Sequence, residues 1–296
     1  MSIMFIFGYV GNLLTLVVLR FERGLRLFSK FILYMQAIWD TVVLLVPGTR
    51  YLFLIMGNID IRNYNYYFKW IHLYFTYLAF DLIGWYLSAL SIERMCLVLW
   101  PTNYYIQRLS YKEGALLTLI FIVVGSMINY NIFIETNFNY TITSYVVLIF
   151  ATLIPFIIIF STTFMILYKL RKGFNQVSNQ SQTKPQRSPA FAVKMIIATS
   201  IYYLITSTPM ALVMIITYGS PNWFPDTYSQ KLSYNGGTLF LTSNAAMKFY
   251  LYNISTPHIR RIVFKPIRRL KTKITGGSVK KNLETEMTIN DEITQK

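Results

Sequence analysis

Three charged side chains lie inside long apolar stretches of the sequence: Asp40, Asp81 and Lys248. A charge at the centre of a membrane-spanning helix costs about 2.5–3.5 kcal/mol on insertion scales, so each of these groups needs a counter-charge, hydrogen bonds or water. One chemistry open to such a set is the relay of an ion or a solute across a membrane. A second is a buried ion pair that stabilises a helix bundle.

The residue types that catalysis requires are not found in a usable combination. No nucleophile, base and oxyanion donors can be assembled, and no glycine-rich phosphate-binding loop occurs. The chain has one cysteine, Cys96, and two histidines, which leaves no intrachain disulfide and too few ligands for a metal cluster. We therefore expect a protein that is not an enzyme and that holds neither a cofactor nor a metal.

The composition is that of a membrane protein. Hydrophobic residues make up 54% of the chain, charged residues only 14%, and the mean hydropathy is +0.41. Apolar runs recur at about the length needed to cross a hydrocarbon core roughly 30 Å thick. They predict an all-α membrane protein with a seven-transmembrane helix bundle over residues 1–254, and the predicted spans are 3–19, 31–54, 70–92, 114–134, 144–168, 195–218 and 232–254.

The distribution of basic residues predicts the orientation of this bundle. Most of the 28 Lys and Arg residues fall in the segments that share a side with the C-terminus, and basic loops stay in the cytoplasm. The N-terminus is then outside. The net charge of +16 reports this topology and an affinity for membrane lipid, and it requires no nucleic-acid partner. Because the first span begins almost at Met1, we expect the chain to be truncated or its start site to be misassigned.

The remaining segments have distinct expected roles. Residues 255–266 carry an amphipathic pattern that predicts a short helix on the membrane surface, and the polar segment 267–296 predicts a disordered cytoplasmic tail. Asn139 satisfies the N-glycosylation pattern in an outer loop. Asp81, deep in the third span, is expected either to contact the fourth or fifth helix or to belong to a ligand site.

A motif at the inner end of the third span gives the first family resemblance. In "SIERMCLVLWP" an acid, Glu93, is followed by Arg94 and Met95, with Pro101 seven residues after the arginine. This spacing resembles the Asp-Arg-Tyr motif of the rhodopsin-like (class A) G-protein-coupled receptors. In the seventh span "KFYLY" stands where that family has Asn-Pro-x-x-Tyr, and Tyr252 matches the tyrosine.

Other positions agree with the register of that family. Gly11 and Asn12 match its Gly-Asn pair in the first span, and Asp40 matches its intramembrane aspartate in the second. Pro155 and Pro209 match its helix-kinking prolines. The fragment "FYLYNIS" is similar to the FMRFamide-type neuropeptide receptors.

The resemblance implies three groups of functional residues. Arg94 would hold the inner ends of the third and sixth helices together at rest. The Lys248 ammonium would occupy a polar pocket that holds sodium in many members, beside Asp40. The residues implied in coupling and activation are Glu93, Arg94, Met95, Pro101 and Tyr252. Those implied in the polar cluster are Asn12, Asp40, Asn244 and Lys248. Those implied to line a ligand cavity are Thr76, Tyr77, Phe80, Met210 and Thr238.

The sequence also departs from the family pattern. Lys69 stands where the family has the third-span cysteine of its usual disulfide, and Ser207 replaces its aromatic switch in the sixth span. Lys248 lies roughly 9 Å too deep to be a retinal-bearing lysine, at about 1.5 Å per residue. The family's amine receptors carry an aspartate at the position of Thr76, so an amine ligand is not expected.

These observations predict a plasma-membrane receptor that transduces an extracellular ligand, expected to be a peptide, to a heterotrimeric G protein. The alternative is an ion- or solute-translocating protein that uses Asp40, Asp81 and Lys248. A family member that has lost signalling is a third possibility, since the aromatic switch is missing.

Overall fold

The computed structural model describes residues 2–21, 25–57, 59–130, 148–177, 187–219 and 227–255. The chain divides into two compact units, Met1–Ser255 and Thr256–Lys296, and the second lies outside the described residues. The predicted surface helix beyond Ser255, the predicted tail 267–296 and Asn139 therefore also lie outside them.

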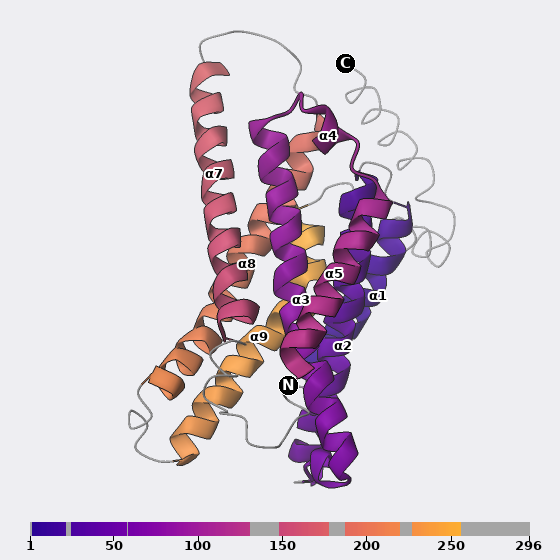
Figure 1. The fold of residues 1–296 in the computed structure, drawn as a ribbon, viewed down its shortest axis with the longest axis vertical. Helices are drawn as coiled ribbons and strands as arrows, with labels where there is room; N and C mark the ends of the chain where they lie inside the picture. The colour runs from indigo at the N-terminus through magenta and orange to yellow at the C-terminus, as the bar shows by residue number, and fades with distance from the viewer. Residues whose placement is uncertain are drawn as a thin grey trace, which may run out of the picture. The chain divides into compact units, whose positions relative to one another are not determined.

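The described residues are helical and contain no strand. Long helices dominate, joined by short turns of helix near their ends (Figure 1). The elements are α1 (Ser2–Phe21), α2 (Leu27–Gly57), η1 (Ile61–Asn63), α3 (Tyr66–Leu99), α4 (Tyr104–Gln107), α5 (Tyr111–Tyr130), the π-helix η2 (Leu148–Leu153), α7 (Ile154–Val177), α8 (Arg187–Gly219) and α9 (Thr227–Ser255).

Each of the seven predicted spans falls on one of these helices as far as it is described. Six helices are long and apolar enough to cross a membrane: α1, α2, α3, α5, α8 and the helix that η2 and α7 form together. The seventh predicted span, 232–254, forms α9, which is long enough but less apolar because it is rich in Ser, Thr and Asn and carries Lys248. For the described residues, the prediction of an all-helical chain with helices suited to cross a membrane is confirmed; six such helices are found, and the seventh span stays a prediction.

The outer surface of the helices is apolar, while several charged and polar side chains are buried beside an apolar core. Large apolar side chains on α5 and α7 are exposed, among them Leu116 at 60%, Met127 at 70% and Phe164 at 64%. In contrast, Asp40 and Lys248 are each only 2% exposed. Exposed apolar faces around a polar interior are what a hydrocarbon solvent selects.

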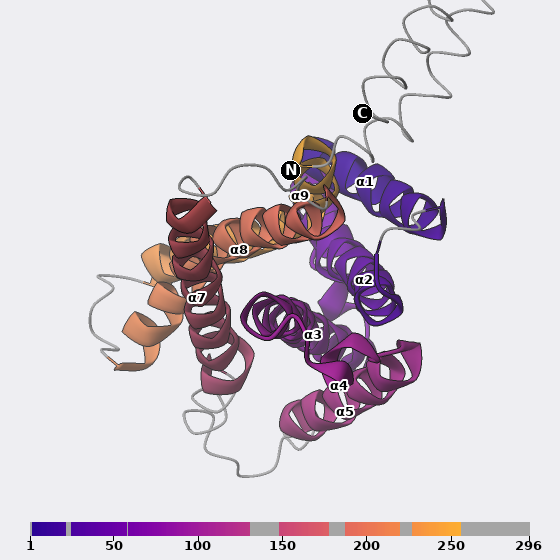
Figure 2. The ribbon, with the colours of Figure 1, turned by 90° about the horizontal axis from the view of Figure 1, so that it is seen from above.

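Helix α3 is the central element. It packs against α2, α5, η2, α7 and α8, and Figure 2 shows it between these helices. Its middle is closed to solvent, with Tyr86, Leu87 and Leu90 completely buried. Helix α9 packs against α8, α1 and α2, so the first and the last described helices are neighbours.

Prolines interrupt three helices. Pro47 and Pro209 lie inside α2 and α8, and Pro155 follows the π-helix η2 at the start of α7. A proline has no N–H to donate and clashes with the carbonyl one turn before it, so the backbone bends or widens there. At η2 the wider π-turn takes up this distortion and brings Ala151 and Thr152 to the wall of an internal cavity.

Gly8 allows α1 to approach α2 and α9 closely. A Cβ at this position would lie 2.6 Å from Leu44 Cδ1 and 2.9 Å from Ala246 Cβ. Gly236 in α9 is the contrasting case, because a Cβ there would meet nothing within 4 Å.

We therefore expect opposite results from Gly8→Ala and Gly236→Ala. Overpacking costs about 1–3 kcal/mol, whereas replacing a helical glycine by alanine gains up to ~1 kcal/mol. Gly8→Ala should lower the thermal unfolding midpoint of the purified protein, and Gly236→Ala should leave it unchanged or raise it. Equal midpoints for the two variants would mean that α1 does not pack at this distance.

Candidate functional site

The two charges on α2 and α9 face each other. Lys248 Nζ donates to Asp40 Oδ1 at 2.7 Å and to Oδ2 at 3.0 Å, and both residues are 2% exposed. The contact is a buried, bidentate ion pair between helices whose residues are 208 positions apart. Neither charge therefore faces lipid.

Several polar atoms of the predicted polar cluster, and of Gln36 one turn before Asp40, are unsatisfied. Among the described residues, Asn12 Nδ2, Asn244 Oδ1 and both amide atoms of Gln36 are buried without a hydrogen-bond partner. The amide nitrogen of Asn244 donates to Thr206 Oγ1 at 3.0 Å, which joins α9 to α8. The structure thus brings Asp40 and Lys248 together, while the hydrogen bond of Asn244 goes to α8.

A second charged cluster lies where α3 ends near the start of α2. Ser29 donates to both carboxylate oxygens of Glu93, at 2.8 and 2.6 Å, and Arg94 Nη2 donates to Ser29 Oγ at 2.7 Å. Arg26 Nη1 lies 3.8 Å from Glu93 Oε1, and Arg94 Nη2 lies 4.0 Å from Glu93 Oε2. Glu93 and Arg94 are 4% and 5% exposed, so this is an interior cluster and not a surface pair.

The partners of Arg94 differ from those that the resemblance implied. Within the described residues its polar contacts are to Glu93 beside it and to Ser29 of α2. The link between α3 and α8 comes instead from Ser91 and Ser200, whose hydroxyls lie 3.2 Å apart and are fully buried.

The other residues implied in coupling take different places. Met95 is partly buried next to the cluster, and Pro101 lies exposed in the turn after α3. Tyr252 belongs to α9, but its side chain lies outside what the structure describes. These three are therefore not brought together with Arg94 by any described contact.

An internal cavity of about 250 Å³ lies among α2, α3, η2, α8 and α9. All five residues that the resemblance implied for ligand binding line it: Thr76, Tyr77, Phe80, Met210 and Thr238. Ser207, which stands in place of the aromatic switch, lines it too and is 1% exposed. A smaller side chain at this position leaves room that an aromatic ring would fill.

Asp81 joins two helices by a hydrogen bond and also lines the cavity. It accepts a hydrogen bond from Asn129 Nδ2 at 2.6 Å, which connects α3 to the helix of the fourth predicted span, α5. It also lines the cavity, although only 1% of the residue is exposed. Among the described residues Asp81 has no ion-pair partner.

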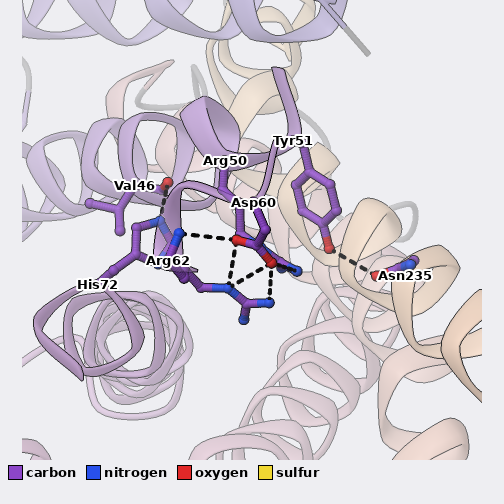
Figure 3. A network of polar contacts seen from close by, with 7 residues as sticks. All are labelled: Val46, Arg50, Tyr51, Asp60, Arg62, His72 and Asn235. Atoms are coloured by element: carbon purple, nitrogen blue, oxygen red, sulfur yellow. Dashed lines mark hydrogen bonds and ion pairs between the residues drawn. The ribbon is translucent and has the colours of Figure 1, made fainter. Parts of the chain in front are cut away.

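A third charged network lies near the start of α3, at the end of this helix opposite to Arg94. Figure 3 shows its residues. Asp60 precedes η1 and accepts hydrogen bonds from Arg62 and from Arg50 of α2, with closest contacts of 2.7 and 3.1 Å. Hydrogen bonds from Arg62 and then from Arg50 hold the pKa of Asp60 far below its usual range. The carboxylate therefore stays ionised near neutral pH, and its stabilisation of the fold declines progressively as the pH falls from the ordinary pKa of an aspartate towards the lowered pKa.

Two further contacts of this end tie helices together. His72 of α3 contacts the Val46 carbonyl of α2 at 2.8 Å, and Tyr51 donates to Asn235 of α9 at 3.3 Å (Figure 3). The positions of Arg50, Arg62 and His72 at the cavity wall were not anticipated from the sequence. One feature of the sequence could have indicated the turn that carries Arg62: Asp60 stands directly before Ile61 and Arg62, and aspartate is a preferred N-cap residue.

The described residues contain no group of three or more His, Cys, Asp or Glu that could hold a metal ion. Comparisons with the models of known protein families and with curated proteins find no match. An interpretation of this chain must therefore be built from its own motifs and geometry.

Proposed function

We propose that the chain is a seven-span receptor of the rhodopsin-like class that transduces an extracellular ligand, a peptide, to a heterotrimeric G protein. The observation that carries this proposal is the layout of α3. One end of this central helix lines the cavity with Thr76, Tyr77 and Phe80, and the other end carries the buried cluster of Glu93 and Arg94. A ligand that shifts α3 at the cavity would act on both regions through one rigid element.

The seventh span in this proposal is α9. Its polar residues need not contact lipid, because the helix packs against α8, α1 and α2 and its Lys248 is neutralised by Asp40. With seven spans, the N-terminus lies outside and the basic segments lie in the cytoplasm of a cell whose plasma membrane holds the receptor.

Glycosylation tests this topology. Asn139 lies in a proposed outer loop and Asn179 in a proposed inner loop, and both satisfy the acceptor pattern. We expect a deglycosylating enzyme to shift the gel mobility of the wild type and of the control variant Asn179→Gln, but not of Asn139→Gln. A shift that Asn179→Gln abolishes would invert the orientation.

The function itself is tested by two measurements on the same purified protein. In the first, the protein is reconstituted with a heterotrimeric G protein, and guanine-nucleotide exchange is followed while peptide pools are added. In the second, protein-only liposomes are assayed for the flux of ions and small solutes. A receptor gives peptide-dependent exchange without flux.

Flux without exchange would establish the translocation alternative. The cavity wall includes Asp81 but neither Asp40 nor Lys248, whose charges are engaged with each other, and this arrangement disfavours a relay through all three. Absence of both activities would identify a receptor-like chain that has lost signalling, and it would overturn the proposal.

A further inference from the structure

The cavity has a basic rim. Arg50 and Arg62 both line it, whereas Asp60, the carboxylate that they share, does not. The side chains of these two arginines are 20% and 24% exposed. Asp60 holds both guanidinium groups in place, as Figure 3 shows.

The charge of this rim is not balanced within the described residues. Two guanidinium groups share one carboxylate, which leaves one positive charge beside the cavity. Each arginine contacts Asp60 through its Nε and Nη2 atoms, so the N–H groups of both Nη1 atoms are directed away from these contacts. A second carboxylate could accept from them in the planar geometry that guanidinium groups favour.

The floor of the cavity is acidic. Asp81 is the buried group there; it accepts a hydrogen bond from Asn129 and has no ion-pair partner among the described residues. Because burial without a counter-charge disfavours the ionised carboxylate, a ligand ammonium group would supply the positive charge that the ionised form requires, together with additional hydrogen bonds. The walls between the rim and the floor are aromatic and apolar, with Tyr77, Phe80 and Met210 among them.

The extent of the cavity along α3 sets the length of a matching ligand. His72 and Asp81 both line the cavity, and His72 precedes Asp81 by nine residues on this helix. At ~1.5 Å per residue this separation is about 13 Å along the helix. An extended peptide covers that distance with about four residues, at roughly 3.3–3.6 Å each.

We infer that the cavity binds an extended peptide segment of about four residues, with a free α-ammonium group at Asp81 and a carboxylate between Arg50 and Arg62. This inference rests on the proposed function and adds the ligand's polarity, length and direction. It excludes a peptide whose amino end is blocked. It also excludes a ligand with a single charge.

The inference is tested with purified full-length protein and no G protein, so that binding is separated from signalling. The probes are tetrapeptide pools built only from uncharged residues, in four forms: both ends free, acetylated, amidated, and blocked at both ends. Peptides retained by the protein after size exclusion are counted by mass spectrometry. A dipeptide pool with free ends serves as the length control.

We expect the pool with both ends free to be retained at least about tenfold more than each blocked pool and than the dipeptides, because a lost partner of a buried charge weakens binding by this much or more. Asp81→Asn should remove the preference for a free ammonium and keep that for a free carboxylate. Arg62→Gln and Arg50→Gln should each weaken the preference for a free carboxylate and keep that for a free ammonium. The control Arg108→Gln alters an exposed arginine at the other end of the bundle and should change nothing.

Equal retention of the four pools by the wild type would overturn the inference without recourse to any variant. So would an equal loss of all preferences in variants whose thermal unfolding midpoint matches that of the wild type. If peptides with blocked ends drive nucleotide exchange in the reconstituted system, the receptor function stands and only the assigned ligand polarity fails.

Discussion

Asp40→Asn and Lys248→Met should each strongly reduce the amount of folded protein, and the double variant should recover much of it. The pair is bidentate and buried, so removal of one partner leaves an uncompensated charge in the interior. That cost is about 3–5 kcal/mol, whereas removal of both charges of a buried pair is often close to neutral. Size-exclusion chromatography of the solubilised variants measures the folded fraction directly.

The matched control for this cycle is Lys112→Met, which removes a lysine that is exposed at the start of α5. It should leave the folded fraction unchanged. If the double variant is as impaired as the sum of the two single ones, Asp40 and Lys248 are not energetically coupled. A result of that kind would also remove the argument that α9 can span the membrane.

The second large effect is expected in the cluster of Glu93, Arg94 and Ser29. Substitution of Arg94 and substitution of Ser29 should change nucleotide exchange in opposite directions. Arg94→Ala removes the guanidinium that the proposed receptor presents to its G protein, and nucleotide exchange should fall by at least about tenfold with ligand affinity within a few fold. Ser29→Ala removes the hydroxyl that joins Arg94 to Glu93 and should raise ligand-independent exchange. A free-energy difference of ~1.4 kcal/mol suffices for a tenfold shift between two states.

Arg108→Ala separates this effect from a general loss of basic charge. Arg108 is exposed and lies over the ring of Tyr104 at 3.9 Å, so its removal leaves the buried cluster intact. Exchange should stay near the wild-type rate. If Arg94→Ala also signals normally, the arginine has only a structural role and the proposed coupling region lies elsewhere.

The helices could be predicted from the sequence because their signal is local. Runs such as 195–218 are hydrophobic and carry no charged residue on any side, as a membrane helix requires. The segment 232–254 was predicted as a span of the same kind, yet α9 is more polar than the other six helices, and its Thr238, Thr242 and Asn244 are buried within the bundle. Apolar length alone does not distinguish a helix surrounded by lipid from one that other helices enclose.

The candidate site was predictable only where a residue violates its local context. Lys248 and Asp40 are charges in apolar runs, and a need for mutual compensation follows from that fact alone. Ser29 gives no such signal, since a serine near a helix end is ordinary. Its role depends on α3 ending beside α2, which is a property of the tertiary packing. Arg50 and Arg62 give no signal of this kind either, because their approach to one carboxylate depends on how η1 returns the chain.

The ion pair between α2 and α9 also sets a problem of biosynthesis. Its two halves are 208 residues apart, and at roughly 5–20 residues per second a ribosome needs about ten to forty seconds to pass from one to the other. During that interval α2 holds an aspartate without its counter-charge. In the proposed seven-span receptor, the insertion machinery must keep this helix near water or shield it from lipid until α9 emerges, and α9, the least apolar of the proposed spans, meets the counter-charge of its lysine only if α2 is already present.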